Sequence, residues 1–220
     1  MKNKNRKNLY VAAGLLTAFV GWTVCVRFVD VRAIGPQGSL VGLASLNQFV
    51  HSLTGVRLSL YTITDWLGLV PIAVALGFAS LGLVQWIKRK HIKRVDSDLF
   101  VLGGLYIVLA GMYLLFESVV INYRPTLING YLEVSYPSST TLLVLCVMPT
   151  AGMQLQKRIQ NNLLKRFVLF AVAVFTILMV LGRLLSGVHW VTDIVGGALL
   201  SSGLVSLYRF ISTCPKHTDI

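Results

Sequence analysis

Charge is scarce in this sequence, and acidic residues and cysteine are scarcer still. Only 13% of its 220 residues are charged, with eight Asp and Glu against 20 Lys and Arg. So little charge excludes an ordinary soluble domain, in which about a quarter of the residues are charged. The three cysteines are odd in number and lack metal-ligand spacing, which excludes a disulfide framework and a cysteine metal site. We interpret them as small apolar residues of the fold: Cys25, Cys146 and Cys214.

Apolar residues make up 55% of the sequence and gather in long runs. A helix needs about 20 such residues to cross the hydrocarbon core of a bilayer. The runs therefore predict an all-α fold, an integral membrane bundle of six transmembrane helices. The predicted spans are residues 9–29, 63–87, 99–121, 140–154, 167–185 and 189–211. They form one domain, 1–220, in which the bundle occupies residues 9–212 between tails at 1–8 and 213–220.

The first connection, residues 30–62, is the longest. Within it, apolar residues recur at helical spacing from Leu40 to Leu53, which predicts a short helix lying in the membrane interface. His51 of this helix is either a residue of its polar face or one that assists lipid entry. At the start of the second span, Asp65 is expected to cap the helix and Pro71 to kink it.

Basic residues are distributed unevenly over the two ends of the predicted bundle. The terminal tails, the loops near residues 88–94 and 157–166, and Arg209 at the end of the last span hold 15 of the 20 Lys and Arg. The sequence thus predicts a multi-pass protein of the plasma membrane. The positive-inside rule places these basic segments and both termini in the cytoplasm. The same distribution argues against nucleic acid as the partner that the formal charge of +12 would otherwise indicate. The remaining arginines fall at the outer face: Arg27, Arg32, Arg57, Arg124 and Arg183.

One stretch, residues 182–197, places chemically active groups between two apolar runs. If a helix begins near Ser186, with that residue as its N-cap, His189 and Asp193 share one face four residues apart. The carboxylate then holds the imidazole in one tautomer. Arg183 supplies a permanently charged fork that suits phosphate oxygens. Together these residues predict a histidine nucleophile or base, an orienting carboxylate and an anion clamp.

The spacing Arg183, His189, Asp193 resembles the third motif of the type 2 phosphatidic acid phosphatase family, the lipid phosphate phosphatases. In that family the His is the nucleophile, the Asp orients it and the Arg binds phosphate. The motif normally begins Ser-Arg, and here it begins Gly182-Arg183. The resemblance thus implies a catalytic pair, His189 and Asp193, and a phosphohistidine intermediate.

Two further motifs of the family are present in altered form. Arg124-Pro125 resembles the end of the first motif, but Glu117 stands where the family has Lys; we expect Pro125 to stop the third span. The segment 137–140 resembles the second motif, Pro-Ser-Gly-His, with Thr140 at the position of the general acid His. The resemblance implies that phosphate is bound by four residues of these motifs: Arg124, Arg183, Ser138 and Ser139.

The sequence therefore predicts a membrane enzyme that hydrolyses a lipid phosphate at the outer leaflet, without cofactor or metal. His189 and Asp193 alone are too few ligands for a metal site. Because Thr140 cannot act as an acid, a polyprenyl diphosphate such as undecaprenyl diphosphate suits the site better than a phosphatidate-type monoester. Glu117 is an alternative acid. A non-catalytic phospholipid-binding or lipid-moving relative, and a lipid phosphotransferase, remain the alternatives to a phosphatase.

Overall fold

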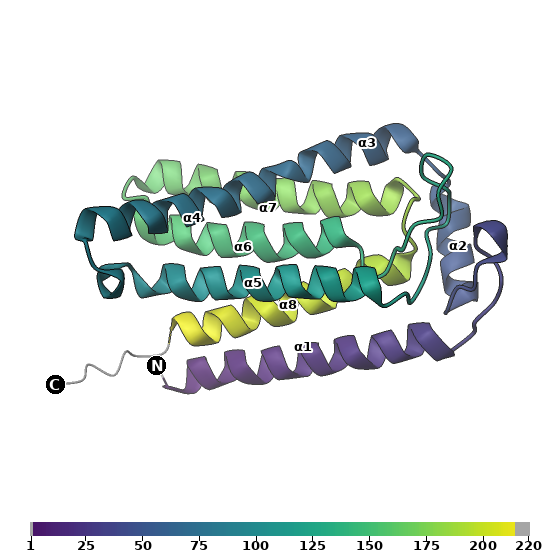
Figure 1. The fold of residues 1–220 in the computed structure, drawn as a ribbon, viewed down its shortest axis with the longest axis horizontal. Helices are drawn as coiled ribbons and strands as arrows, with labels where there is room; N and C mark the ends of the chain where they lie inside the picture. The colour runs from purple at the N-terminus through teal and green to yellow at the C-terminus, as the bar shows by residue number, and fades with distance from the viewer. Residues whose placement is uncertain (1, 214–220) are drawn as a thin grey trace.

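The computed structural model describes residues 2–213, and its regular elements in that range are all helices. In chain order they are α1 (Lys2–Phe28), η1 (Pro36–Gly38), α2 (Ala44–Thr54), α3 (Leu58–Leu67), α4 (Leu69–Arg89), η2 (Ile92–Arg94), α5 (Ser97–Ser118), α6 (Ser139–Arg158), α7 (Asn162–Leu185) and α8 (Val191–Ser212). The long helices run side by side, and α2 lies across one end of the bundle (Figure 1). The predicted tail beyond residue 213, with Cys214, lies outside the described residues.

Five helical segments of the described chain are long and apolar enough to cross a membrane. They are Asn5–Phe28, Leu58–Arg89, Ser97–Ser118, Asn162–Leu185 and Val191–Ser212. The all-α membrane bundle predicted from the sequence is confirmed in this form, whereas the predicted number of six spans stays a prediction. The sixth long helix, α6, carries buried polar residues such as Thr150 and Gln154 and packs against α4, α7 and α8. A helix covered by protein on several sides does not need an entirely apolar surface.

The segment predicted as the second span is built from two helices, and the expectation that Asp65 caps it is wrong. Asp65 lies in the last turn of α3 and does not cap a helix, because α3 already begins at Leu58. The helical run is interrupted at Gly68, three residues before Pro71. Proline has no N–H to donate to the carbonyl one turn earlier. Pro71 therefore weakens the helix in the turn that precedes it, where Gly68 lies.

The connection between α7 and α8 also differs from the prediction. Ser186 ends α7 as its C-cap instead of starting a new helix, and its backbone N–H donates to the carbonyl of Gly182 at 2.9 Å. Gly187 follows with φ +66°, a conformation that ends helices and favours glycine. The next helix, α8, begins only at Val191. His189 therefore precedes the helix that holds Asp193, and the two do not share a helical face.

The connection between α5 and α6, residues 119–138, crosses the same end of the bundle. Since α5 ends at Ser118, Pro125 does not stop it. The connection folds back on itself, with the backbone N–H of Arg124 donating to the carbonyl of Glu133 at 3.0 Å. Tyr136 anchors its end, because its buried ring lies so close to Gly196 of α8 that a Cβ there would overlap it.

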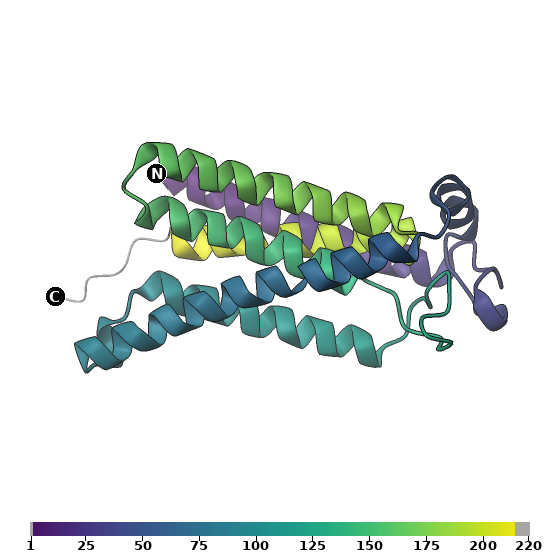
Figure 2. The same cartoon turned by 90° about the horizontal axis from the view of Figure 1, so that it is seen from above.

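The two ends of the bundle carry different parts of the chain. The start of α1, the end of α8 and the turns that contain η2 and join α6 to α7 lie together at one end (Figures 1 and 2). At the opposite end lie α2, the connection 119–138 and the turn between α7 and α8. The residues singled out for phosphate chemistry thus meet at the end away from the basic loops.

Candidate active site

His189 is the point on which the candidate site converges. Its side chain is buried, and its Nε2 lies 3.2 Å from Arg124 Nη1 and 3.2 Å from Arg183 Nη2. A guanidinium group can only donate hydrogen bonds, so Nε2 must accept and carries a free electron pair. The proton of the neutral ring then belongs to Nδ1, which lies 3.5 Å from Asp193 Oδ2. This arrangement assigns the tautomer that a nucleophile at Nε2 requires.

Asp193 is held in place by the start of α8. It is fully buried, and its Oδ2 accepts a hydrogen bond from the backbone N–H of Trp190 at 2.9 Å. A carboxylate in the first helical turn that bonds back to the N-cap N–H is a common way to stabilise a helix start. The side chains of Ser135 and Asn122 lie next to the same carboxylate. The contact from Asp193 to His189 thus comes from the helix cap and the loop rather than from helical spacing.

The surroundings of His189 keep its imidazole neutral. Burial lowers the pKa of His189 well below its usual value of 6.5, and the charges of Arg124 and Arg183 lower it further. The backbone of Ser135 acts in the opposite direction. Burial and the two positive neighbours both disfavour the protonated ring. At neutral pH the side chain is therefore an unprotonated base with its electron pair available.

Arg183 projects from the last turn of α7 and is almost fully buried, at 1% exposure. Its guanidinium lies over the ring of Tyr61, 4.9 Å from the ring centroid, and Nη1 is 3.5 Å from Asp65 Oδ1. Gly182 allows this approach of α3 to α7, because a Cβ there would overlap the methyl group of Thr64. Tyr61 and Asp65 were not predicted as site residues; their spacing of four within a helix is the signal that could have indicated a shared face.

Arg124 reaches the same point from the connection between α5 and α6. Its Nε pairs with Glu133 Oε2 at 2.9 Å, and its guanidinium lies 5.8 Å from the centroid of Tyr61. One aromatic ring therefore lies beside both arginines, and a cation over a ring face is a favourable placement. Glu133 was also not predicted, since nothing in its local sequence distinguishes it from a solvated loop acid.

A cavity of about 270 Å³ lies beside His189 and Arg124. It is also lined by Glu117 from the end of α5, by Glu133 and by Ser139 at the start of α6. The cavity gives a ligand access to the imidazole and to one guanidinium at once. It also places Glu117, which stands where the family has a phosphate-binding Lys, in the same space as His189.

The residues of the altered second motif divide between this cavity and an adjacent apolar one. Ser139 lines both cavities, whereas Thr140 lines only the apolar one. Ser138 is fully buried; its Oγ accepts from the Thr141 hydroxyl at 3.0 Å, and its backbone N–H donates to the carbonyl of Asp193 at 3.1 Å. Ser138 therefore joins α6 to α8, and the structure does not bring its side chain to the cavity beside His189.

The first outer connection supports the loop that carries His189. The imidazole of His51, in α2, packs against Trp190 with ring centroids 5.3 Å apart, and burial lowers the pKa of His51. Trp190 Nε1 donates to the carbonyl of Tyr123 at 2.7 Å, while the backbone N–H of Arg57 donates to the carbonyl of Ser186 at 2.8 Å. These contacts make His51 a packing partner of the loop, a role that neither of the sequence-based interpretations described.

Comparison with known proteins identifies the family of this chain and a similar fold. The model of the PAP2 superfamily matches residues 72–214, which is more than half of the chain. Among solved structures, the chain is similar to a transmembrane PAP2 type phosphatidylglycerolphosphate phosphatase from Bacillus subtilis. That match has a TM-score of 0.56 and 22% sequence identity, and it covers 95% of this chain and 99% of the other. An identity this low shows the fold, and no curated protein matches the chain. The matched model, which covers all three motifs and the residues that meet at His189, establishes that this chain belongs to the PAP2 superfamily.

Proposed function

We propose that this protein is an integral-membrane lipid phosphatase in which His189 accepts the phosphoryl group. The observation that carries the proposal is the position of His189 Nε2, between two guanidinium groups and on the opposite side of the ring from Asp193. Membership of the PAP2 superfamily supports a phosphatase in general. A protein that only bound phosphate would need the arginines but would not need an oriented, unprotonated imidazole.

The geometry supports a two-step displacement. A substrate phosphate first takes over the N–H donors of Arg124 and Arg183 that now contact His189, which frees Nε2 to attack phosphorus. A bond from Nε2 to phosphorus forms, the bond from phosphorus to the leaving oxygen breaks, and that oxygen keeps the electron pair. Asp193 stabilises the positive charge that then develops on the ring. The two guanidinium groups stabilise the charge on the transferring oxygens.

The second step returns the enzyme to its starting state. Water attacks the phosphorus of the phosphohistidine, and the electron pair of the phosphorus–nitrogen bond returns to Nε2. One proton of the water is lost to solvent, and inorganic phosphate leaves. The leaving group, which departed with its electron pair, takes up one proton from solvent, so the net reaction is hydrolysis.

The nature of the leaving group favours a lipid diphosphate as the substrate. A general acid accelerates the departure of a poor leaving group by about 10²–10⁴-fold, and Thr140 cannot supply a proton at neutral pH. A phosphate that leaves from a diphosphate needs protonation less than an alkoxide does. Glu117 lines the cavity of His189 and is the carboxyl group that would serve a monoester substrate.

The adjacent apolar cavity supports a lipid rather than a soluble phosphate ester. It has a volume of about 770 Å³ and lies between α4, α5 and α6. Ser139 and Leu142 line both this cavity and the polar cavity beside His189. A lipid could therefore place its phosphate at His189 and its tail between the helices, at what we propose is the outer leaflet.

The proposal is tested by phosphate release from purified protein on a panel of lipid monophosphates and diphosphates. We expect turnover by the parent protein, faster on diphosphates, and none by His189→Ala, because this substitution removes the imidazole that accepts the phosphoryl group. His91→Ala is the matched control, since His91 is exposed at the other end of the bundle. Unchanged phosphate release by His189→Ala would refute the mechanism. A parent protein that is inactive on every lipid tested would favour a binding protein instead.

A further inference from the structure

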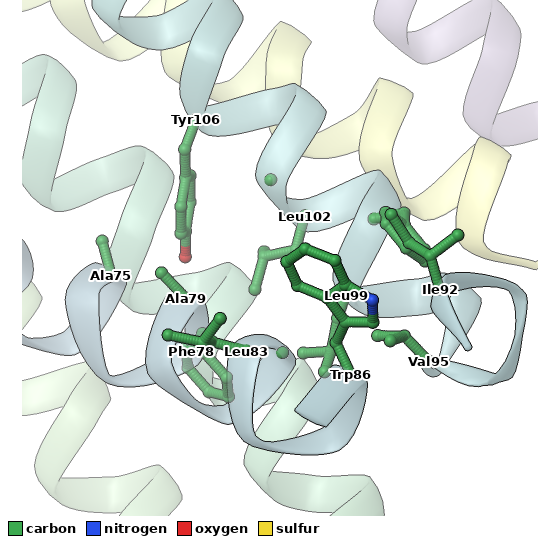
Figure 3. A pocket seen from close by; sticks show the side chains of 13 residues that line it. Ala75, Phe78, Ala79, Leu83, Trp86, Ile92, Val95, Leu99, Leu102 and Tyr106 are labelled. Carbon is green, nitrogen blue, oxygen red and sulfur yellow. The ribbon is translucent and has the colours of Figure 1, made fainter. Parts of the chain in front are cut away.

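A second apolar cavity lies deeper between α4 and α5, toward the end of the bundle that carries η2 (Figure 3). Its volume is about 290 Å³, and its far end is lined by Trp86, Ile92 and Phe100. Four residues line both this cavity and the larger one next to the candidate active site: Ala75, Ala79, Gly103 and Tyr106. The two cavities are therefore parts of one groove, which begins beside Ser139 and follows the interface of α4 and α5.

The groove is longer than one leaflet of a bilayer. On α4 its lining runs from Leu69, at the start of the helix, to Trp86, near its end. With a rise of 1.5 Å per residue, this stretch of helix is about 26 Å long. The hydrocarbon core of a whole bilayer is about 30 Å thick, so one leaflet contributes about 15 Å.

Small side chains keep the groove open where α4 faces α5. A Cβ built on Gly82 or on Gly103 would meet no atom within 4 Å. Tyr106 points from α5 toward Ala75 and Ala79 (Figure 3), and its hydroxyl group lies 3.1 Å from the hydroxyl of Thr150 in α6. This hydrogen bond holds the ring to one side, so the path from the site to the deeper cavity has a fixed wall.

We propose that the groove holds the tail of one substrate lipid whose chain is longer than a leaflet, a long polyprenyl chain, and that its deep end selects for chain length. This inference rests on the proposed function and specifies its substrate class. The length of the groove and its continuity with the cavity beside the site favour this occupant. The acyl tail of a glycerophospholipid held at the outer face would end near the bilayer midplane. It would not reach the deep part of the groove, which Gly82 and Trp86 line.

The test fills the deep part of the groove without disturbing the fold. Gly82→Leu and Gly103→Leu each add a side chain there; both positions lie about 20 Å along their helices from the end near His189. Gly77→Leu and Gly104→Leu are matched controls, because a Cβ at these positions also meets no atom within 4 Å and neither residue lines the groove. The value of kcat/KM is measured on farnesyl diphosphate and on undecaprenyl diphosphate in the same detergent.

We expect the parent protein to prefer the undecaprenyl chain. The two groove variants should lose at least about tenfold of kcat/KM on that chain, since displaced methylene groups are worth this much in an apolar pocket. They should stay within about twofold of the parent on the farnesyl chain, and the two controls should match the parent on both. Equal kcat/KM of the parent on both chains, or equal losses of the groove variants on both, would overturn the inference while leaving the phosphatase proposal intact.

A second measurement does not depend on turnover. An undecaprenyl diphosphate with a photoreactive diazirine on its terminal isoprene unit should label peptides that contain Trp86 or Phe100. Labelling confined to α1 or α7 would contradict the inference even if the protein hydrolysed no lipid. An inactive protein that is labelled at Trp86 would instead show that the groove holds the chain and that the phosphatase proposal is the part that fails.

Discussion

The imidazole of His189 lies between two positive groups and one carboxylate, and this setting decides both its charge and its tautomer. Arg124 and Arg183 direct donors at Nε2, while Asp193 lies on the side of Nδ1. Each of the three contacts comes from a different part of the chain. The reactivity proposed for His189 is therefore a property of the folded site rather than of the residue.

The lowered pKa of His189 leads to a prediction about pH. A base with a lowered pKa stays neutral until the pH falls through that lower value, so we expect the acid limb of kcat/KM to lie below the usual histidine value of 6.5. Arg124→Gln removes one of the charges that lower this pKa, and it should move the acid limb upward although the variant is slower. Rate profiles of the two proteins over a pH series provide the comparison. An acid limb at or above 6.5 in the parent would show that the imidazole is not held neutral as described.

The contact of Asp193 with His189 leads to a second prediction. Asp193→Asn keeps an oxygen that can accept from the Trp190 N–H, so the start of α8 should remain folded. The amide cannot stabilise a positive imidazole, and turnover should fall by about 10⁴-fold, as it does when a histidine loses its orienting carboxylate elsewhere. Phosphate release and the thermal unfolding temperature are measured on the same sample. If the unfolding temperature of Asp193→Asn falls far enough to account for its lost activity, Asp193 has only a structural role.

At the scale of the elements, the turn between α7 and α8 determines where His189 lies. Gly187 has φ +66°, and a Cβ on it would overlap the backbone carbonyl of Gly55, just after α2. The turn is thus pressed against the first outer connection, in which the backbone N–H of Arg57 also donates to the carbonyl of Ser186. The interfacial position predicted for α2 stays a prediction, whereas its contact with this turn is a feature of the fold.

This close approach can be tested against a second glycine with the same backbone strain. Gly130 also has positive φ, +84°, but a Cβ there would meet no atom within 4 Å. Gly130→Ala should therefore cost only the strain of the left-handed conformation, about 1–2 kcal/mol. Gly187→Ala adds a backbone overlap and should lower both the thermal unfolding temperature and the turnover much more. Equal effects of the two substitutions would mean that the turn tolerates displacement from Gly55.

At the scale of the whole molecule, charge is separated between the two ends of the bundle. The described basic loops lie at the end where α1 begins and α8 ends, and the residues around His189 lie at the other (Figure 1). The positive-inside rule then orients the bundle with His189 outside and the termini in the cytoplasm. This orientation would expose the site to lipid phosphates of the outer leaflet.

The orientation is tested by cysteine labelling in intact cells, in a Cys25→Ser background because Cys25 is exposed. Asn129→Cys, in the exposed connection between α5 and α6, should be blocked by a membrane-impermeant reagent. His91→Cys, exposed at the opposite end, should be blocked only after permeabilisation. The reverse pattern at the two positions would place the site in the cytoplasm.

Much of the architecture follows from the sequence by itself. Long apolar runs have few alternatives to membrane helices, since a bilayer leaves the backbone no hydrogen-bond partner outside a helix. The predicted runs accordingly fall within the helices α1 and α3 to α8, to within several residues at each end. Family membership is likewise readable from the spacing of Arg183, His189 and Asp193, because that spacing is a local feature of the chain. The residues of this motif could be named before their geometry was known.

The tertiary structure decided what depends on contacts between distant segments. Gly187 is a local signal for a helix that ends at Ser186, but its packing against Gly55, which fixes the turn, cannot be read from the sequence. Tyr61 and Glu133 join the site only because α3 and the connection 119–138 fold back over α7 and α8. The groove between α4 and α5 likewise depends on how these two helices pack against each other. Its shape therefore cannot be read from the sequence of either helix alone.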